Sequence, residues 1–322
     1  MGRHRPSIFM KSTSMKTNKR FQNVNQWKLH ASAAAYLAGW KVVRLLPEPV
    51  AYRLFSWAAV IASRRGRGMD QLRRNLTRVV GAENVDRALV KRSMQSYARY
   101  WCEAFRLSVI ARDPDVIHRV DAHAVGVEQV NPHSPMIIVL PHSGNWDLIG
   151  MYFVKKVGTF TTVAERVKPE SLFRAFVNYR RSLGFEVLPL TGSETSPYSV
   201  LLQRVREGRT VCLLGERDLT SHGVEVEFFG ETTRMPAGAV KLALDSGAPL
   251  HVAHTWFEGN DWGLSLSEPV EITDVKSGVQ AIAQIMEKNI KAHPEDWHLL
   301  QPLWINDLDR RRYESGLQPK ND

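Results

Sequence analysis

The sequence predicts an α/β fold: a mostly parallel central sheet flanked by helices, with an N-terminal amphipathic helical collar. Two observations support this prediction. From about residue 136, short and almost wholly apolar runs alternate with helical patterns, as in buried parallel strands joined by crossover helices. Before that point, apolar residues recur at helical spacing. The 322 residues are 43% hydrophobic and 24% charged, which is ordinary for a globular chain.

The N-terminal part is expected to begin with a disordered basic tail at 1–26. This segment has six basic residues, no acidic residue and no apolar run of the kind that a secretion signal needs. Amphipathic patterns follow it, and prolines or glycines interrupt them. We expect helices from Trp27 to the break at Pro47, at about 50–63, at 69–80 and at 92–110.

Basic residues are concentrated in the first quarter of the chain. Residues 1–80 hold 16 Lys and Arg against 2 Asp and Glu, whereas residues 81–322 hold 27 against 31. Helices with aromatic residues on one face and basic residues on the other suit an anionic lipid surface, although such helices can also simply cover a core. We expect residues 27–80 to associate with a membrane without crossing it, because a span needs roughly 20 apolar residues.

The remainder of the chain alternates between strand and helix. Single strands are expected at 136–140, 159–165, 186–190 and 210–216, and a hairpin at 249–258 and 263–272. Helices are expected at 145–157, 169–184, 196–208, 235–247 and 276–293. The pattern shows no internal linker, so we expect one domain over 27–310 and a C-terminal tail at 311–322.

Polar side chains follow three of the expected strands. In open α/β sheets, ligands bind beyond the carboxyl ends of the strands, so these side chains are expected to meet in one site. The three groups are His142, Glu165 with Arg166, and Glu216 with Arg217 and Asp218.

His142 and Asp147 are the candidate catalytic pair. Pro141 and Gly144 favour a turn between them, so Asp147 is expected to fold back and accept a hydrogen bond from the imidazole. A carboxylate in that place fixes the tautomer and leaves the other ring nitrogen free as a base. The alternative is that His142 only precedes a helix whose N-terminus favours an acidic residue.

Other kinds of site have weak support. The chain has no G-x-S-x-G pattern and no P-loop or dinucleotide glycine pattern. Cys102 and Cys212 lie in apolar surroundings, which favours reduced, inert thiols. We expect no metal and no bound cofactor, and the mildly acidic body argues against nucleic-acid binding. A lone base then suggests direct transfer from an activated donor to a hydroxyl or amine.

The segment HSGNWD at 142–147 resembles the H-x4-D block of the glycerolipid and lipid A acyltransferases. Further blocks appear in the order found in that family: VAERVKPESLFRAFVNYRRSLGFEVLPL, LLGERDLT, VEVEFFGETTRMPAGAVKLALDSGAPL and HPEDWHLLQPLW. The resemblance covers about residues 27–305. Within the family, the set is most similar to members that acylate mannosylated phosphatidylinositol.

The resemblance implies a specific reaction. A palmitoyl-type chain is transferred from acyl-CoA to the 6-hydroxyl of the mannose at position 2 of inositol. The partners implied are acyl-CoA, phosphatidylinositol mannosides and the inner leaflet of the cell membrane, where the enzyme is peripheral. His142 matches the family's catalytic histidine, Asp147 its partner and Glu216 an acidic residue near the acceptor.

Further residues are candidates for substrate binding. By the same resemblance, Glu165 and Arg180 match positions that line the sugar site. Phosphates need cations, and Arg166, Arg217 and Arg234 are candidates, although each also suits a solvated surface. Backbone N–H groups of residues 143–145 are candidate donors to an oxyanion, or only form the turn.

Two other functions remain open at this point. One is a soluble ester or thioester hydrolase that uses the same His/Asp pair on water. The other is a non-catalytic lipid- or nucleic-acid-binding protein that uses the basic N-terminal quarter. The oligomeric state and the residues that line an acyl groove are left open by the sequence.

Overall fold

The computed structural model describes residues 36, 38–166, 168–192, 195–218, 220 and 222–308. The two expected tails, at 1–26 and 311–322, lie outside these residues, as does the beginning of the first expected helix. The extent of the single domain therefore stays a prediction at both ends.

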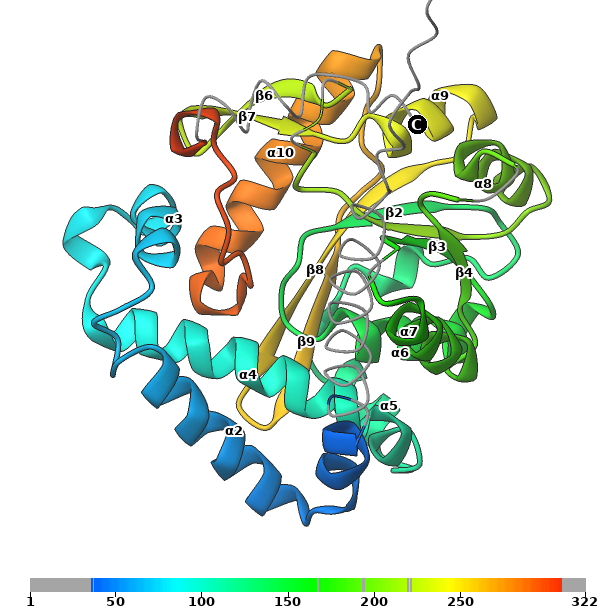
Figure 1. The fold of residues 1–322 in the computed structure, drawn as a ribbon. Coiled ribbons are helices and arrows are strands. Elements are labelled where there is room, and N and C mark those ends of the chain that lie inside the picture. Colours follow the sequence, from blue (N-terminus) through cyan, green and yellow to red (C-terminus); the bar gives the residue numbers. More distant parts are fainter. Residues whose placement is uncertain are drawn as a thin grey trace, which may run out of the picture.

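The described chain forms a seven-stranded sheet, as expected (Figure 1). Strand β8 pairs antiparallel with β9, and the other pairs are parallel, so the prediction of a mostly parallel sheet is confirmed. In sheet order, the strands are β1 (Ala124–Val125), β9 (Asp261–Leu266), β8 (Leu250–Glu258), β2 (Ile137–Leu140), β5 (Val211–Leu214), β3 (Thr161–Ala164) and β4 (Glu186–Pro189).

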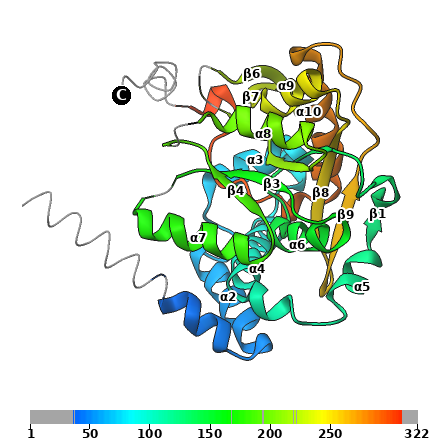
Figure 2. The ribbon, with the colours of Figure 1, turned by 90° about the vertical axis from the view of Figure 1, so that its right-hand side faces the viewer.

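Helices cover both faces of the sheet, and Figure 2 shows the strands between the two groups. Alternate residues of β2 point to opposite sides: Ile137 and Val139 belong to one apolar core and Ile138 to the other. The helices on the first side are α8 (Pro197–Arg206), α9 (Gly238–Ser246) and α10 (Val275–Ala292). Those on the second side are α5 (Val116–Asp121), α6 (Trp146–Val157) and α7 (Glu170–Ser182).

The expected N-terminal collar is helical. Residues 38–45 are helical, and α2 (Glu48–Ala62), α3 (Asp70–Val80) and α4 (Arg87–Ile110) follow. Helix α4 begins five residues earlier than the sequence pattern suggests, because the Asp86 side chain accepts a hydrogen bond from the Leu89 N–H and caps the helix. Helices α2 and α4 pack along each other (Figure 1).

Several elements were not predicted, among them helix α5 and strand β1. A second, two-stranded sheet joins β6 (Val224–Phe228) to β7 (Glu231–Met235), in a stretch expected to be irregular. Its strands bury alternate residues, including Val226 and Phe228, and Gly230 adopts the left-handed conformation in the turn. The alternating apolar and acidic residues of VEVEF were a usable signal for this hairpin.

Helix α2 has an apolar face that no other described element covers. Val50, Leu54, Trp57 and Ile61 recur at helical spacing, and each is between 47% and 63% exposed. The opposite side of the helix packs on α4 through residues such as Ala59, which is 4% exposed. Within the described residues, no helix has both the length and the apolar character needed to cross a bilayer.

Two leucine substitutions should distinguish the buried core beneath α3 from the exposed face of α2. Leu76→Ala removes a fully buried side chain from the small core beneath α3, and we expect the free energy of unfolding to fall by about 3 kcal/mol. Leu54→Ala, on the exposed face of α2, should change it by less than about 0.5 kcal/mol. Urea unfolding measures both. Equal losses would show that the α2 face is covered in solution.

Candidate active site

The register of the sheet brings His142 and Glu216 together. Strands β2 and β5 are parallel neighbours, and Leu140 pairs with Leu214 at their carboxyl ends. His142 and Glu216 each lie two residues beyond that pair. The imidazole Nδ1 lies 2.5 Å from Glu216 Oε1, and the His142 backbone N–H donates to the same oxygen at 3.0 Å.

The environment of Glu216 fixes which ring nitrogen of His142 is protonated. Burial by itself would raise the pKa of Glu216, but the charge and hydrogen bonds of His142 outweigh burial and hold it below its usual value. The carboxylate is therefore ionised and can only accept, so Nδ1 carries the proton. Nε2 is left as the basic nitrogen. The His142 side chain is 41% exposed, and Nε2 has no protein partner among the described residues.

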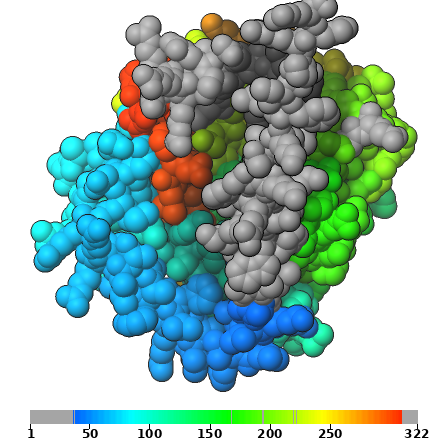
Figure 3. All heavy atoms as spheres, viewed as in Figure 1, coloured from blue at the N-terminus to red at the C-terminus, as the bar shows by residue number. Residues whose placement is uncertain are grey.

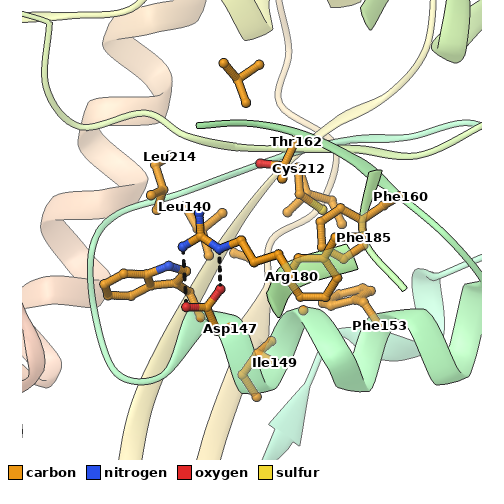
Figure 4. A pocket seen from close by; sticks show the side chains of 15 residues that line it. Leu140, Asp147, Ile149, Phe153, Phe160, Thr162, Arg180, Phe185, Cys212 and Leu214 are labelled. Carbon is orange, nitrogen blue, oxygen red and sulfur yellow. Dashed lines mark hydrogen bonds and ion pairs between the residues drawn. The ribbon is translucent and has the colours of Figure 1, made fainter. Parts of the chain in front are cut away.

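The expected pairing of His142 with Asp147 is wrong. Asp147 lies in the first turn of α6 and faces α4 and α7, where Arg180 Nε donates to its Oδ1 at 2.8 Å (Figure 4). The Tyr100 hydroxyl donates to the other oxygen at 3.1 Å. Burial opposes the charge on Arg180, but Asp147 outweighs it and raises the arginine pKa above its usual value. Asp147 therefore forms a buried ion pair behind the site.

Residues 142–145, which we call the catalytic turn, are held from several sides. His298 N–H donates to the His142 carbonyl at 2.7 Å, and Gly144 N–H donates to the Asp296 carbonyl at 2.9 Å. The Thr255 hydroxyl donates to the Ser143 carbonyl. Gly144 is required here because its φ is +51° and an added Cβ would lie 2.7 Å from the backbone of Thr255.

These contacts also bear on the candidate oxyanion donors, for which two roles were left open. The Ser143 N–H donates to the Pro141 carbonyl at 2.9 Å, and the Gly144 N–H is bonded to Asp296. Both amides are thus engaged within the protein, and two of the three predicted donors serve to shape the turn.

A cleft of about 590 Å³ opens beside His142. Its polar lining includes Glu165, Arg217 and Asp218, so side chains that follow three different strands do meet here, as the sequence predicted. Its apolar lining includes nearly buried core residues, so the cleft extends from the strand ends into the first core. These apolar residues include Val139, Leu201, Val279 and Ile282.

A second, narrow cavity of about 50 Å³ lies on the α6–α7 side of the same strand ends (Figure 4). Val163 and Leu214 line both this cavity and the cleft. The Asp147–Arg180 ion pair lies at its wall, and the remaining lining is largely aromatic and aliphatic. The aromatic residues are Trp146, Phe153, Phe160 and Phe185.

Comparison with known proteins identifies the family. The model of the bacterial lipid A biosynthesis acyltransferases matches residues 15–306. This chain belongs to that family. It is an acyltransferase, and the family assignment expected from the sequence is confirmed.

Two relatives of the acyltransferase are similar over most of their length. A protein of Mycolicibacterium smegmatis is 49% identical over 288 residues, which cover 87% of this chain and 94% of that protein. A protein of Mycobacterium tuberculosis is 49% identical over 292 residues, which cover 86% of this chain and 90% of that protein. Both are named phosphatidylinositol mannoside acyltransferase.

Of the three arginines predicted to bind phosphate, two are not part of the cleft lining, although the Arg234 carbonyl accepts from the N–H of Asp218, which is part of it. Arg166 forms an exposed ion pair with Glu170 at 2.9 Å and donates to the Gly192 carbonyl. Arg234, on β7, pairs with Glu225 of β6 at 2.6 Å. The cleft lining, among the described residues, includes neither. Their role in binding phosphate stays a prediction.

The sequence did not predict the residues that contact the catalytic turn but lie far from it in the sequence. Glu103 on α4 and the segment 296–298 contact it, although they lie roughly 40 residues before and 150 residues after it in the sequence. A usable signal was Glu103 itself, an acidic residue among aromatic ones on the buried side of a helix.

Arg180 and Arg166 both pair with an acidic residue, but their substitution should affect stability differently. Arg180→Ala leaves the buried Asp147 carboxylate without its cation, and we expect the free energy of unfolding to fall by about 3 kcal/mol. Arg166→Ala removes an exposed ion pair and an exposed hydrogen bond to the Gly192 carbonyl, and it should produce no measurable change. Chemical denaturation measures both, and similar losses for the two variants would contradict this assignment.

Proposed function

We propose that this acyltransferase transfers a long acyl chain of the palmitoyl type from acyl-CoA to a phosphatidylinositol mannoside. The acceptor oxygen is the 6-hydroxyl of the mannose at position 2 of inositol. The names of the two relatives support the acceptor class. The observation that carries the chemistry is the His142–Glu216 pair at the cleft, with Nε2 of the imidazole unpaired within the described protein.

The pair suits a single general-base step. Nε2 of His142 takes the proton of the sugar hydroxyl as that oxygen attacks the thioester carbonyl, which typically contributes about 10²–10⁴-fold in rate. The carboxylate of Glu216 stabilises the imidazolium through Nδ1–H. The new C–O bond forms as the C–S bond breaks, and the imidazolium returns the proton to the CoA thiolate. His142 is then ready for the next cycle.

The surroundings favour direct transfer rather than an acyl-enzyme. Ser143, next to His142, is fully buried and bonded to His254 through its hydroxyl. Burial raises the pKa of the Cys212 thiol, so it stays protonated and is a poor nucleophile. A thioester is already activated, so no covalent intermediate is needed.

The apolar part of the cleft is the proposed site of the acyl chain. Each CH₂ that leaves water contributes about 0.8 kcal/mol, so a long chain gains more from such a lining than a short one. Glu165 and Arg217 lie at the polar part of the same cleft, where sugar hydroxyls and phosphate groups need partners. The proposed acyl end and the proposed polar end therefore belong to one cleft, which His142 also lines.

We place the enzyme at the cytoplasmic face of the cell membrane, as a peripheral protein. Helix α2 lies at the surface of the molecule (Figure 3, blue), and its exposed apolar face supports this placement. Exposed arginines lie on and next to the helix, at Arg53, Arg64, Arg65 and Arg67. Apolar side chains flanked by cations suit a leaflet with anionic lipids, where each cation contributes about 1 kcal/mol.

Activity should depend on the carboxylate of Glu216, which accepts the hydrogen bond from His142. Glu216→Gln keeps the shape of the side chain but loses the charge that orders the imidazole, so we expect kcat to fall by about 10²–10⁴-fold. His142→Ala should lower it at least as far. Mass spectrometry of products from palmitoyl-CoA and mannosylated phosphatidylinositol measures the rates.

Glu170→Gln is the matched control, because Glu170 is exposed on α7, and it should retain full activity. Near-normal turnover by Glu216→Gln would contradict the mechanism. Equally fast release of CoA with and without the glycolipid would instead identify a hydrolase.

Membrane binding should depend on the exposed face of α2. A Leu54→Ser, Trp57→Ser variant loses two exposed apolar side chains, and we expect binding to vesicles that contain phosphatidylinositol to weaken tenfold or more. Leu244→Ser, at an exposed leucine of α9, is the matched control and should bind like the wild type. Co-sedimentation measures the partition. Equal binding by all three proteins would exclude α2 as the membrane face.

A further inference from the structure

Glu103 is a buried carboxylate that joins four parts of the molecule. It lies on α4 and is fully buried. Its Oε1 accepts from the Tyr52 hydroxyl of α2 at 2.8 Å and from Arg99 Nε at 2.7 Å. Its Oε2 accepts from Asn145 Nδ2 and from Trp262 Nε1 of β9, both at 2.7 Å. With two donors on each oxygen, the carboxylate has one well-defined position.

Among these donors, Asn145 connects Glu103 to the reaction site. Asn145 is the last residue of the catalytic turn and the N-cap of α6, and it is 1% exposed. Its Oδ1 accepts from the Leu148 N–H at 3.0 Å while its Nδ2 donates to Glu103. Both ends of one rigid amide group are thus fixed, and the amide holds the turn to α4.

The identity of residue 145 supports a role beyond capping. Ser, Asp and Asn cap helices about equally well, so the cap alone does not require asparagine. Only asparagine offers an acceptor to Leu148 and a donor to Glu103 at the same time. Aspartate would place a second carboxylate against Glu103, and serine would not span both partners.

We propose that Glu103 is a positioning residue of the acyl transfer: through Asn145 it fixes the turn that presents His142 to Glu216. The main chain of the turn is also held by residues 296–298. Glu103 supplies the side-chain contact from α4, which these main-chain contacts do not replace. The kinetic part of this inference rests on the proposed function, whereas the geometry of the turn does not.

Asn145→Ser tests the contact because it keeps a capping residue at the start of α6 and removes the bond to Glu103. We expect kcat to fall about tenfold or more, with KM for palmitoyl-CoA within about twofold of the wild type. Thr233→Val is the matched control. It removes one buried side-chain bond, from Thr233 to the Leu303 carbonyl, in the β6–β7 sheet, and should leave kcat unchanged.

A second readout does not depend on any substrate. The proton between His142 Nδ1 and Glu216 should give a far-downfield NMR signal, which is assigned by its absence in His142→Asn. We expect this signal to shift or broaden in Asn145→Ser and to stay in place in Thr233→Val. A changed signal supports the inference even where no acyl transfer to a mannoside is detected, so it is separable from the proposed function.

Glu103→Gln is a further variant, which should show the same two changes where it folds. The inference is overturned by an Asn145→Ser variant that folds and keeps both wild-type kcat and the wild-type signal. It is also overturned when Thr233→Val shows the same changes as Asn145→Ser, because a general loss of stability would then explain both.

Discussion

The pairing of β2 with β5 is the constraint on which the site depends. His142 and Glu216 each extend two residues beyond the last paired residues, so the parallel register brings the two residues close together. In a strand, a slip of one residue turns every side chain to the opposite face. The apolar cores on the two faces of the sheet prevent such a slip, and thereby protect the hydrogen bond between imidazole and carboxylate.

Hydrogen bonds of buried polar groups hold the catalytic turn in place at the ends of these strands. The turn is bonded to β8, to the segment 296–298 and to α4, each through groups that would be unfavourable in the interior without a partner. Breaking one contact therefore leaves a second group unsatisfied. The Asp147–Arg180 ion pair has the same character on the α7 side.

The position of the strand ends also explains how one site can serve a lipid reaction. Two largely apolar cavities lie at the tips of the strands, and charged side chains that follow the strands line the larger one. Helix α2 turns an apolar face to the outside, while its Tyr52 reaches the carboxylate of Glu103, which also holds Asn145 of the catalytic turn. The lipid-facing surface proposed here and the reaction site therefore share one buried group.

Local patterns in the sequence predicted the order of most helices and strands, the helical collar, and the three groups of polar residues that follow strands. These features could be predicted because apolar periodicity and turn residues are recognised within a few neighbouring positions. Local patterns also pointed to His142 as a base. Only the tertiary structure decided its partner. Glu216 lies 74 residues further along the chain, and nothing local states that β5 lies next to β2. Asp147 is closer in sequence, but the helix that begins at Trp146 turns its carboxylate toward Arg180, since a helical residue's direction is set by the helix and its neighbours.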